Sequence, residues 1–300
     1  MSVPMVSVAM ITYNQEKYIK ESILGVLNQR ADFEIELIIA DDRSPDATEE
    51  VVKEIIANHP NGHWIKYSRH AENKGMMDNF IWALDTCSGK YTAVCEGDDY
   101  WIDPLKLQKQ VKALEQHAAY SFCFHQGIRL NEVESKYDVY PLTDLTSFDP
   151  VSFFRMITIP MASVVFRKNI SLKFMRDHSH PDFQLLCTLM SVGNAVFIPE
   201  VMSVYRVHPG GVSYNHSSLF YVNKRLNELE FELQNNAFSI AVRNQIARNY
   251  MQHVLYKFDT YKKEISRKEI LRYLVQFIKV KGPDTDFRHF FSRLLKHLIT

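Results

Sequence analysis

The stretch YTAVCEGDDYW, residues 91–101, changes from apolar to acidic after its fifth residue. Its first half is typical of a short buried strand, and its second half places three carboxylates within four residues. Three earlier segments repeat this arrangement of an apolar run followed by polar side chains, with an amphipathic stretch between successive segments. The strands predicted from the four segments are Val6–Ile11, Phe33–Ala40, Trp64–Ser68 and Tyr91–Cys95. Such alternation predicts β-α-β units and a mostly parallel sheet flanked by helices, an α/β fold.

Helices are predicted in the intervals between these strands. They cover Glu16–Asn28, a segment that starts at Pro45 with Ser44 as its N-cap, and Met76–Thr86. Further predicted elements are helices from Asp103 to about His117, from Asp149, and over Phe183–Val192, and strands at Tyr120–His125, Ala162–Phe166 and Ala195–Pro199. Residues 127–146 match no specific pattern, and from Leu219 onward the pattern is almost wholly helical. We therefore expect one α/β domain over residues 1–215 and a helical region over residues 216–300.

Composition excludes several classes of protein. In 300 residues, 46% are hydrophobic and 23% are charged, which is ordinary for a globular chain. Thirty-five Lys and Arg balance 35 Asp and Glu, so a basic surface for nucleic acid is not expected. The charge is uneven, since residues 216–300 have 15 basic and 8 acidic side chains, whereas residues 1–215 have 20 and 27.

The cellular compartment is predicted from cysteine usage and hydropathy. The four cysteines form no C-x-x-C pair, so a zinc site or a disulfide framework is a poor interpretation. No stretch approaches the roughly 20 apolar residues that a membrane-spanning helix needs. The apolar N-terminus has no basic residue before Lys17, unlike a secretory signal peptide. We expect a cytoplasmic protein.

Polar residues follow the end of each of the four predicted strands. The segments are Thr12-Tyr13-Asn14, Asp41-Asp42-Arg43-Ser44, Glu72-Asn73-Lys74-Gly75 and Glu96-Gly97-Asp98-Asp99. In an open parallel sheet the carboxyl ends of the strands meet at one edge, where ligands bind. The paired Asp41 and Asp42 have two interpretations: they end a strand and cap a helix, or a carboxylate accepts hydrogen bonds from a ribose or a base.

The last of these segments has the highest density of charge. Neighbouring carboxylates repel one another unless a cation is present, and Mg²⁺ takes one or two protein carboxylates together with phosphates and water. In an extended backbone Glu96 and Asp98 point to the same face, and Gly97 lets a ligand approach closely. The segment therefore predicts a metal-diphosphate site, with a solvated acidic turn as the alternative.

The four segments, in this order and at these spacings, resemble the motifs of glycosyltransferase family two, whose members have the GT-A fold. The resemblance covers about residues 5–215 and not the helical tail. It implies transfer of a sugar from a nucleotide diphosphate donor to an acceptor hydroxyl, with inversion at the anomeric carbon and with Mg²⁺ or Mn²⁺. Residues 1–100 would then bind the nucleotide sugar, and residues 101–215 would face the acceptor.

The resemblance also implies roles for individual residues. Those that would bind the nucleotide sugar are Thr12, Tyr13, Asn14, Glu16, Asp42, Asn73, Gly75, Glu96, Asp98 and Arg206, with Asp42 on the base. Asp98, Asp99 and His208 would hold the metal. Two positions depart from the family pattern, because Glu96 replaces the commoner first Asp of the acidic motif and Arg43 stands where Gly is usual. Which of the three carboxylates ligate the metal directly stays open.

The second half of the α/β domain supplies candidates for the chemistry. Displacement at an anomeric carbon needs a base for the acceptor proton. Asp182 resembles the family's general base; a helix N-cap is the alternative, and His180 is the nearest competitor. Arg206 or His208 can meet phosphate oxygens of the leaving group, and Gly210-Gly211 can let the loop fold over the donor. A structural histidine and a plain turn are the alternatives there.

The C-terminal region leaves its role open. Asp284–Ile299 can be drawn as an amphipathic helix that lies on an anionic membrane beside a lipid-linked acceptor, or that packs on the catalytic domain or across a dimer. The chain is expected to use a UDP-sugar to extend a glycan or glycolipid in surface polysaccharide synthesis. Two other classes stay open: a non-catalytic sugar-nucleotide-binding or scaffold protein, and a sugar nucleotidyltransferase, which the missing Gly-rich phosphate loop disfavours.

Overall fold

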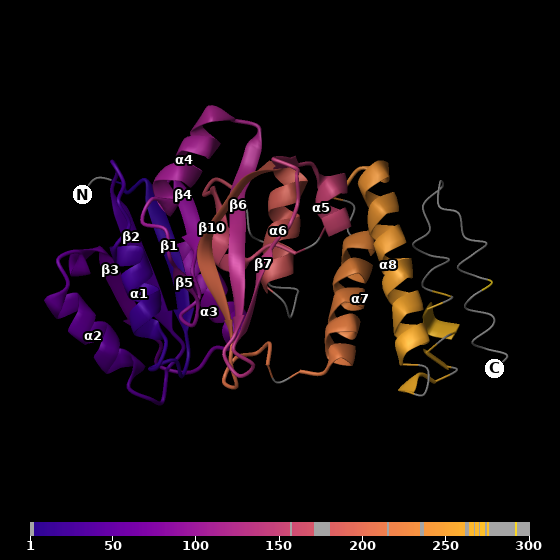
Figure 1. Ribbon diagram of the computed structural model, residues 1–300, viewed down its shortest axis with the longest axis horizontal. Coiled ribbons are helices and arrows are strands. Elements are labelled where there is room, and N and C mark those ends of the chain that lie inside the picture. Colours follow the sequence, from indigo (N-terminus) through magenta and orange to yellow (C-terminus); the bar gives the residue numbers. More distant parts are fainter. Residues whose placement is uncertain are drawn as a thin grey trace. The chain divides into compact units, whose positions relative to one another are not determined.

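The computed structural model describes residues 3–156, 158–170, 181–214, 216–234, 237–261, 264–266, 268–269, 271–273, 275 and 292 (Figure 1). The chain divides into two compact units, of which the first comprises Met1–Asp149 and Thr158–Tyr214. The second comprises Pro150–Ile157 and Asn215–Thr300. The segment from residue 150 to 157, which the sequence analysis grouped with the α/β domain, thus belongs with the C-terminal helices.

The first unit is built around one sheet of ten strands. They are β1 (Val6–Thr12), β2 (Ile35–Asp41), β3 (Ile65–Arg69), β4 (Tyr91–Val94), β5 (Tyr100–Trp101), β6 (Tyr120–Asn131), β7 (Lys136–Tyr140), β8 (Ser147–Phe148), β9 (Val165–Arg167) and β10 (Asn194–Val207). The main order is β3-β2-β1-β4-β9-β6-β10-β5, with β7 on β6 and β8 on β10. Strands β1 to β4 pair in parallel, which confirms the predicted β-α-β units.

Helices flank this sheet because their apolar residues recur on one face. They are α1 (Ile19–Leu27), α2 (Thr48–Asn58), α3 (Met76–Thr86), α4 (Lys106–Gln116) and α6 (Pro181–Val192), with short 3₁₀ turns η1 (Gly62–Trp64) and η2 (Met161–Ser163). In α1, Ile19, Ile23 and Val26 are fully buried and join one core cluster with Leu37 and Ile39 of β2. All seven residues of β2 are buried, so both faces of this strand are covered.

Two local predictions were wrong, and one stretch without a predicted element forms strands. Ser44 does not cap α2, which begins at Thr48; its hydroxyl accepts the N–H of Asn14 instead. Strand β10 does not stop near Pro199 but continues to Val207, because it pairs along β6 and then with β5. Residues 127–146, which matched no pattern, contain the second half of β6 and the whole of β7.

The second unit is helical, as predicted for the C-terminal region. It contains α5 (Pro150–Met156), α7 (Ser218–Gln234) and α8 (Ile240–Thr260), and α8 packs against both other helices. Asn249 donates a hydrogen bond to the carbonyl of Phe154, while Tyr250 and Phe258 of α8 are buried. The predicted helix Asp284–Ile299 lies, except for one residue, outside the described residues. Within the described part, every helix is too short or too polar to cross a bilayer.

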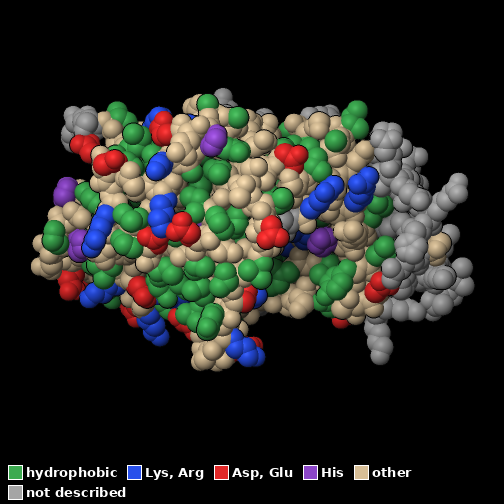
Figure 2. Space-filling model, turned by 45° about the horizontal axis from the view of Figure 1, so that its top comes forward, with side chains coloured by type: hydrophobic (Ala, Val, Ile, Leu, Met, Phe, Trp, Pro, Cys, Tyr) green, Lys and Arg blue, Asp and Glu red, His purple; other side chains and the backbone are tan. Residues whose placement is uncertain are grey.

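Charged side chains are mixed over the surface. On the face drawn in Figure 2, acidic and basic side chains intermingle over the described part of the chain. This agrees with 35 basic against 35 acidic residues.

Candidate functional site at the carboxyl edge of the sheet

The carboxyl ends of β1, β2, β4 and β10 lie at the same edge of the sheet. Strands β1, β2 and β4 are parallel neighbours. The chain direction reverses at β9 and is restored at β6, with which β10 pairs in parallel. Segments that are more than 100 residues apart in sequence, after β4 and after β10, therefore meet at this edge.

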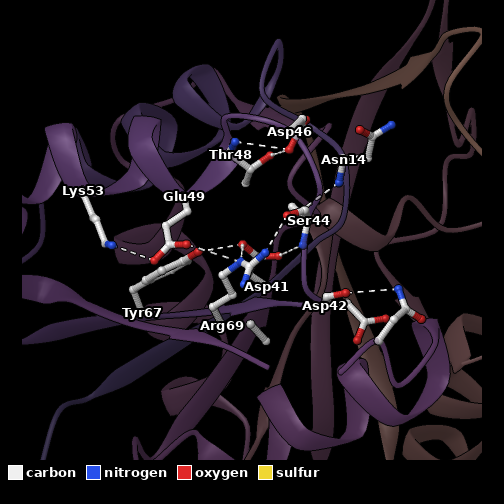
Figure 3. Close-up of polar contacts among 12 residues, drawn as sticks. Asn14, Asp41, Asp42, Ser44, Asp46, Thr48, Glu49, Lys53, Tyr67 and Arg69 are labelled. Carbon is white, nitrogen blue, oxygen red and sulfur yellow. Dashed lines mark hydrogen bonds and ion pairs between the residues drawn. The ribbon is translucent and has the colours of Figure 1, made fainter. Parts of the chain in front are cut away.

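The turn after β1 is tied to the loop after β2 (Figure 3). Three backbone N–H groups donate to side-chain oxygens of the loop: Asn14 to Ser44 at 3.0 Å, Gln15 to Thr48 at 3.2 Å and Glu16 to Asp46 at 2.9 Å. The carboxylate of Glu16 in turn accepts the N–H of Ala47 at 2.9 Å. Glu16, predicted to line a nucleotide pocket, thus holds the loop; a contact with nucleotide stays a prediction.

Two backbone positions in these turns are left-handed. Asn14 has φ 57° and Arg43 has φ 64°. Asn adopts this conformation readily, whereas for Arg it is sterically unfavourable. Arg43 is also the position at which the family pattern has Gly. The departure noted in the sequence therefore falls where glycine would be relaxed.

The two aspartates after β2 have different surroundings. Asp41 is fully buried and accepts the N–H of Ser44 at 2.7 Å and the hydroxyl of Tyr67 at 2.6 Å (Figure 3). Burial, and then the hydrogen bond to Asp41, raises the pKa of Tyr67. Arg69 approaches the same carboxylate at 3.9 Å. Asp41 thus ends the strand, as the first of its two interpretations held, but it does not cap α2, whose N-cap residue is Ala47.

Asp42 brings together two segments that the sequence analysis singled out. Its carboxylate oxygens accept the N–H groups of Lys74 at 2.7 Å and Gly75 at 2.9 Å, and its carbonyl accepts the amide of Asn73 at 3.1 Å. Gly75 has φ 83°, which an L side chain rarely adopts. Asp42, Asn73 and Gly75, which were predicted to bind the nucleotide sugar, therefore form one hydrogen-bonded unit before α3.

Thr12 and Tyr13 occupy the start of the turn after β1. Thr12 is buried, and its hydroxyl has no hydrogen-bond partner in the part of the chain that the structure describes. The ring of Tyr13 is 50% exposed. Asn14 beside it is also exposed. These residues offer an unsatisfied hydroxyl, an aromatic surface and an amide close to Asp42, whose N–H donates to the carbonyl of Thr12 at 3.0 Å.

The acidic segment after β4 forms a turn, here called the carboxylate turn, residues 96–99. The N–H of Asp99 donates to the carbonyl of Glu96 at 3.1 Å. The backbone here is therefore not extended, so the condition under which Glu96 and Asp98 would point to the same face is not met. A Cβ at Gly97 would lie 2.4 Å from Oε1 of Gln15, so the chain itself, not a ligand, makes the close approach at this glycine.

Asp98 and His208 face each other across the edge of the sheet. Oδ2 of Asp98 lies 3.2 Å from Nε2 of His208, with side-chain exposures of 21% and 4%. The His208 ring packs on Tyr18 at 4.2 Å between centroids. A Cβ at Gly211 would lie 3.2 Å from Nε2 of this ring, so Gly211 makes room for His208, whereas a Cβ at Gly210 would make an ordinary contact with the ring at 3.4 Å.

This pair fits a divalent metal that also binds a ligand. Among the described residues, no group of three or more His, Cys, Asp or Glu side chains is arranged to enclose a metal ion. Two ligands at about 2.1 Å on adjacent positions of an octahedral Mg²⁺ lie about 3 Å apart, close to the spacing of Asp98 and His208. Phosphate oxygens and water would complete such a shell.

Asp99 is a buried carboxylate beside this pair. Its Oδ1 accepts the N–H of Arg206 at 3.0 Å, whereas Oδ2 is buried and has no hydrogen-bond partner among the described residues. Burial, and then the charge of Asp98, raises the pKa of Asp99 well above its usual range. The charge of Asp182 contributes in the same direction. Asp182, in the first turn of α6, is therefore near the carboxylate turn; its competitor His180 lies outside the described residues.

Several residues near the site carried no signal in the sequence. Arg206 contacts Glu21 and Glu132, and its guanidinium lies over the rings of Tyr18 and Tyr100. Tyr18 and Glu21 are one helical turn apart, a spacing that places them on one face of α1. Glu132 follows a part of β6 that local pattern did not predict. Burial raises the pKa of Tyr140 and Tyr205, and the charge of Asp99 acts in the same direction on both, so both lie within electrostatic range of this carboxylate.

A family model and related protein sequences match the chain. The model of Glycosyl transferase family 2 matches residues 7–167, just over half of the chain. An uncharacterized protein of Mycobacterium tuberculosis is 36% identical over 216 residues, 69% of this chain. The match spans 60% of that relative's length. An uncharacterized glycosyltransferase of Haemophilus influenzae is 28% identical over 268 residues, 84% of this chain and 81% of its own.

Solved structures share the fold. Residues 1–349 of S. aureus TarS, solved in complex with UDP-GlcNAc, superpose with a TM-score of 0.69 at 16% identity, covering 98% of this chain and 89% of that one. The mannosyltransferase PcManGT of Pyrobaculum calidifontis, solved with GDP-Man and Mn²⁺, has a TM-score of 0.59 at 14% identity, covering 100% and 87%. The predicted GT-A fold with C-terminal helices is confirmed by this likeness.

Proposed function

Because the chain belongs to glycosyltransferase family 2, we propose that it transfers a sugar from a nucleoside diphosphate donor to an acceptor hydroxyl with inversion. The observation that carries this proposal is the pairing of Asp98 with His208 at 3.2 Å, beside the buried Asp99. Two segments that are 110 positions apart in sequence converge there on a ligand set suited to a metal-bound diphosphate.

The donor is proposed to lie along the turns after β1, β2 and β4. The exposed Tyr13 ring and the amide of Asn14 would receive the nucleoside together with Thr12 and Asp42. Glu96 completes the proposed donor set around the diphosphate. Support comes from two structurally similar proteins, TarS, which was solved with UDP-GlcNAc, and PcManGT, which was solved with GDP-Man. We propose a UDP-sugar as donor; a GDP-sugar is the competing outcome of the binding test below.

The metal is proposed to be Mn²⁺ or Mg²⁺, held by Asp98 and His208 with Asp99 behind them. When bound, it neutralises charge that develops on the leaving diphosphate. PcManGT, solved with Mn²⁺, supports this choice.

Asp182 is proposed to accept the acceptor's proton. The acceptor oxygen then forms its bond to the anomeric carbon while the bond from that carbon to the phosphate oxygen breaks. The electron pair leaves with the nucleoside diphosphate, and the proton stays on Asp182. The proximity of Asp182 to Asp99 supports this assignment, because base and leaving group must flank one carbon.

The acceptor is proposed to be a glycan or a lipid-linked sugar in surface polysaccharide synthesis. The half of the first unit after the carboxylate turn would bind it, with Tyr140 and Tyr205 beside Asp99. We propose that the protein acts in the cytoplasm, at the membrane face where lipid-linked acceptors are presented.

The proposal is tested in two steps on the purified chain. First, melting temperatures are measured with UDP-, GDP-, CDP- and dTDP-sugars, each with and without Mn²⁺, because a ligand that binds the native state raises the melting temperature. Second, release of nucleoside diphosphate is followed for the wild type and for Asp182→Asn. Asn caps a helix about as well as Asp, so this change separates proton transfer from capping.

The expected result is a metal-dependent shift with one class of nucleotide and a loss of turnover of about 100-fold or more in Asp182→Asn, with unchanged donor affinity. The exposed Asp144→Asn serves as the matched control and should keep wild-type turnover. Binding without turnover in the wild type would instead favour a scaffold protein. Equal turnover in the wild type and Asp182→Asn would remove Asp182 as the base.

A further inference from the structure

Arg206 is a buried cation whose three guanidinium nitrogens all face protein oxygens. Its side chain is 4% exposed. Nη1 donates to the carbonyl of Asp98 at 2.7 Å, Nη2 pairs with the carboxylate of Glu21, and Nε lies 3.5 Å from Oε1 of Glu132. A guanidinium engaged on every nitrogen and closed off from solvent has little surface left for a ligand.

The contacts of Arg206 continue to both proposed metal ligands. Its guanidinium carbon lies 4.1 Å from the ring centroid of Tyr100 and 5.3 Å from that of Tyr18. The Tyr18 hydroxyl donates to Glu132 at 3.2 Å, and the Tyr18 ring packs on His208. Arg206 therefore reaches Asp98 directly through a carbonyl, and His208 through Tyr18.

We infer that Arg206 is a positioning residue that, with Glu21 and Glu132, holds Asp98 and His208 at the spacing a divalent metal requires. It acts through these two ligands and not on the donor phosphates. The three residues come from α1, the end of β6 and β10, so the network clamps the carboxylate turn to elements on either side of it. Outer contacts of this kind orient metal ligands and tune affinity. The inference rests on the proposed function, because it presumes the metal site.

The test measures the affinity of the full chain for Mn²⁺ without nucleotide, by the electron paramagnetic resonance signal of free Mn²⁺. Arg206→Lys keeps the positive charge but loses the planar guanidinium with its several N–H donors. If only net charge mattered, the affinity for Mn²⁺ would not change. Positioning predicts that Mn²⁺ binding weakens about tenfold or more. Glu132→Gln should weaken binding in the same direction, and the double variant should bind no more weakly than Arg206→Lys.

The matched control is Glu134→Gln, which removes the same charge from the same hairpin. Glu134 is 56% exposed and pairs only on the surface with Lys136, so Mn²⁺ affinity should stay within about twofold of wild type. Melting temperatures without metal establish that each variant is folded. If Arg206→Lys does not fold, Glu132→Gln, at a side chain 33% exposed, decides the question.

Two results would overturn the inference. If folded Arg206→Lys binds Mn²⁺ like the wild type and loses affinity only for UDP or GDP, Arg206 acts on the phosphates. If Glu132→Gln matches the wild type while Arg206→Lys is impaired, the carboxylate is not part of the clamp. Failure of the wild type to bind Mn²⁺ is a different outcome, because it removes the proposed metal site and the inference with it.

Discussion

Gly97 and Gly210 lie on either side of the proposed metal pair but differ in their surroundings. A Cβ at Gly97 would lie 2.4 Å from Oε1 of Gln15 and 3.0 Å from side-chain carbons of Ile19 and Thr12. At Gly210 the nearest atom would be 3.4 Å away, which is an ordinary contact. The carboxylate turn is thus pressed against the turn after β1, whereas the loop after β10 has room.

Gly97→Ala is expected to lower the free energy of unfolding by about 1–3 kcal/mol, because the added methyl group overpacks the turn. It should also weaken Mn²⁺ binding, since relief of the contact displaces Asp98. Gly210→Ala is the matched control and should change stability by less than about 0.5 kcal/mol. Urea unfolding followed by circular dichroism measures both, and equal stability of the two variants would contradict the packing argument.

Glu36 of β2 joins three strands at the edge of the sheet away from the site. Its carboxylate accepts the hydroxyl of Ser7 on β1, the N–H of Ser88 at 2.9 Å and the ammonium of Lys66 on β3 at 2.5 Å. Burial acts to raise the pKa of Glu36, but the hydrogen bonds from Lys66, Ser7 and Ser88 outweigh it and lower the pKa to about 2. The ionised carboxylate is therefore preferred in the folded chain.

This difference predicts an acid-sensitive contribution to stability. A carboxylate whose pKa falls from 4.5 to about 2 on folding stabilises the fold above pH 4.5 and loses that effect as the pH falls toward 2. Between pH 5 and 2, the free energy of unfolding should fall by roughly 3 kcal/mol more in the wild type than in Glu36→Gln. Glu54→Gln, at an exposed position of α2, should follow the wild type. Parallel curves for all three proteins in urea unfolding across this range would refute the assignment.

Cysteine burial is a property of the first unit as a whole. All four cysteines are buried, none of them more than 3% exposed, and none is joined in a disulfide within the described part of the chain. Burial raises the pKa of Cys87 and of Cys123 to about 12. Because the thiolate is the reactive form, such thiols react only when the chain unfolds.

Native protein at pH 7 should therefore resist maleimide labelling, while denatured protein should take up four equivalents, one for each cysteine. A reducing agent should leave the melting temperature unchanged, since no disulfide is present among these residues. Mass spectrometry of labelled protein measures the first outcome and a thermal scan the second. Rapid labelling of one thiol under native conditions would show that part of the core opens locally.

The elements from β1 to β4 could be predicted to within a few residues, because apolar periodicity is a property of about ten consecutive residues. The polar segments at the strand ends followed from the same pattern, since parallel strands end at one edge. The prediction of Ser44 as an N-cap failed because its hydroxyl accepts a hydrogen bond from the N–H of Asn14, in the turn after β1. Strand β7 and the end of β10 were missed because they form by pairing with β6 rather than by local preference.

The sequence by itself therefore determined the fold class, the order of the first strands and helices, and the acidic residues of the carboxylate turn. Only the tertiary structure decided which side chains contact those residues and fix their positions. Arg206 meets Asp98 across 108 positions of sequence, and Tyr18 meets Glu132 across 114. No local pattern encodes such pairs, because they arise only when β10 and β6 lie side by side and carry distant side chains to one edge.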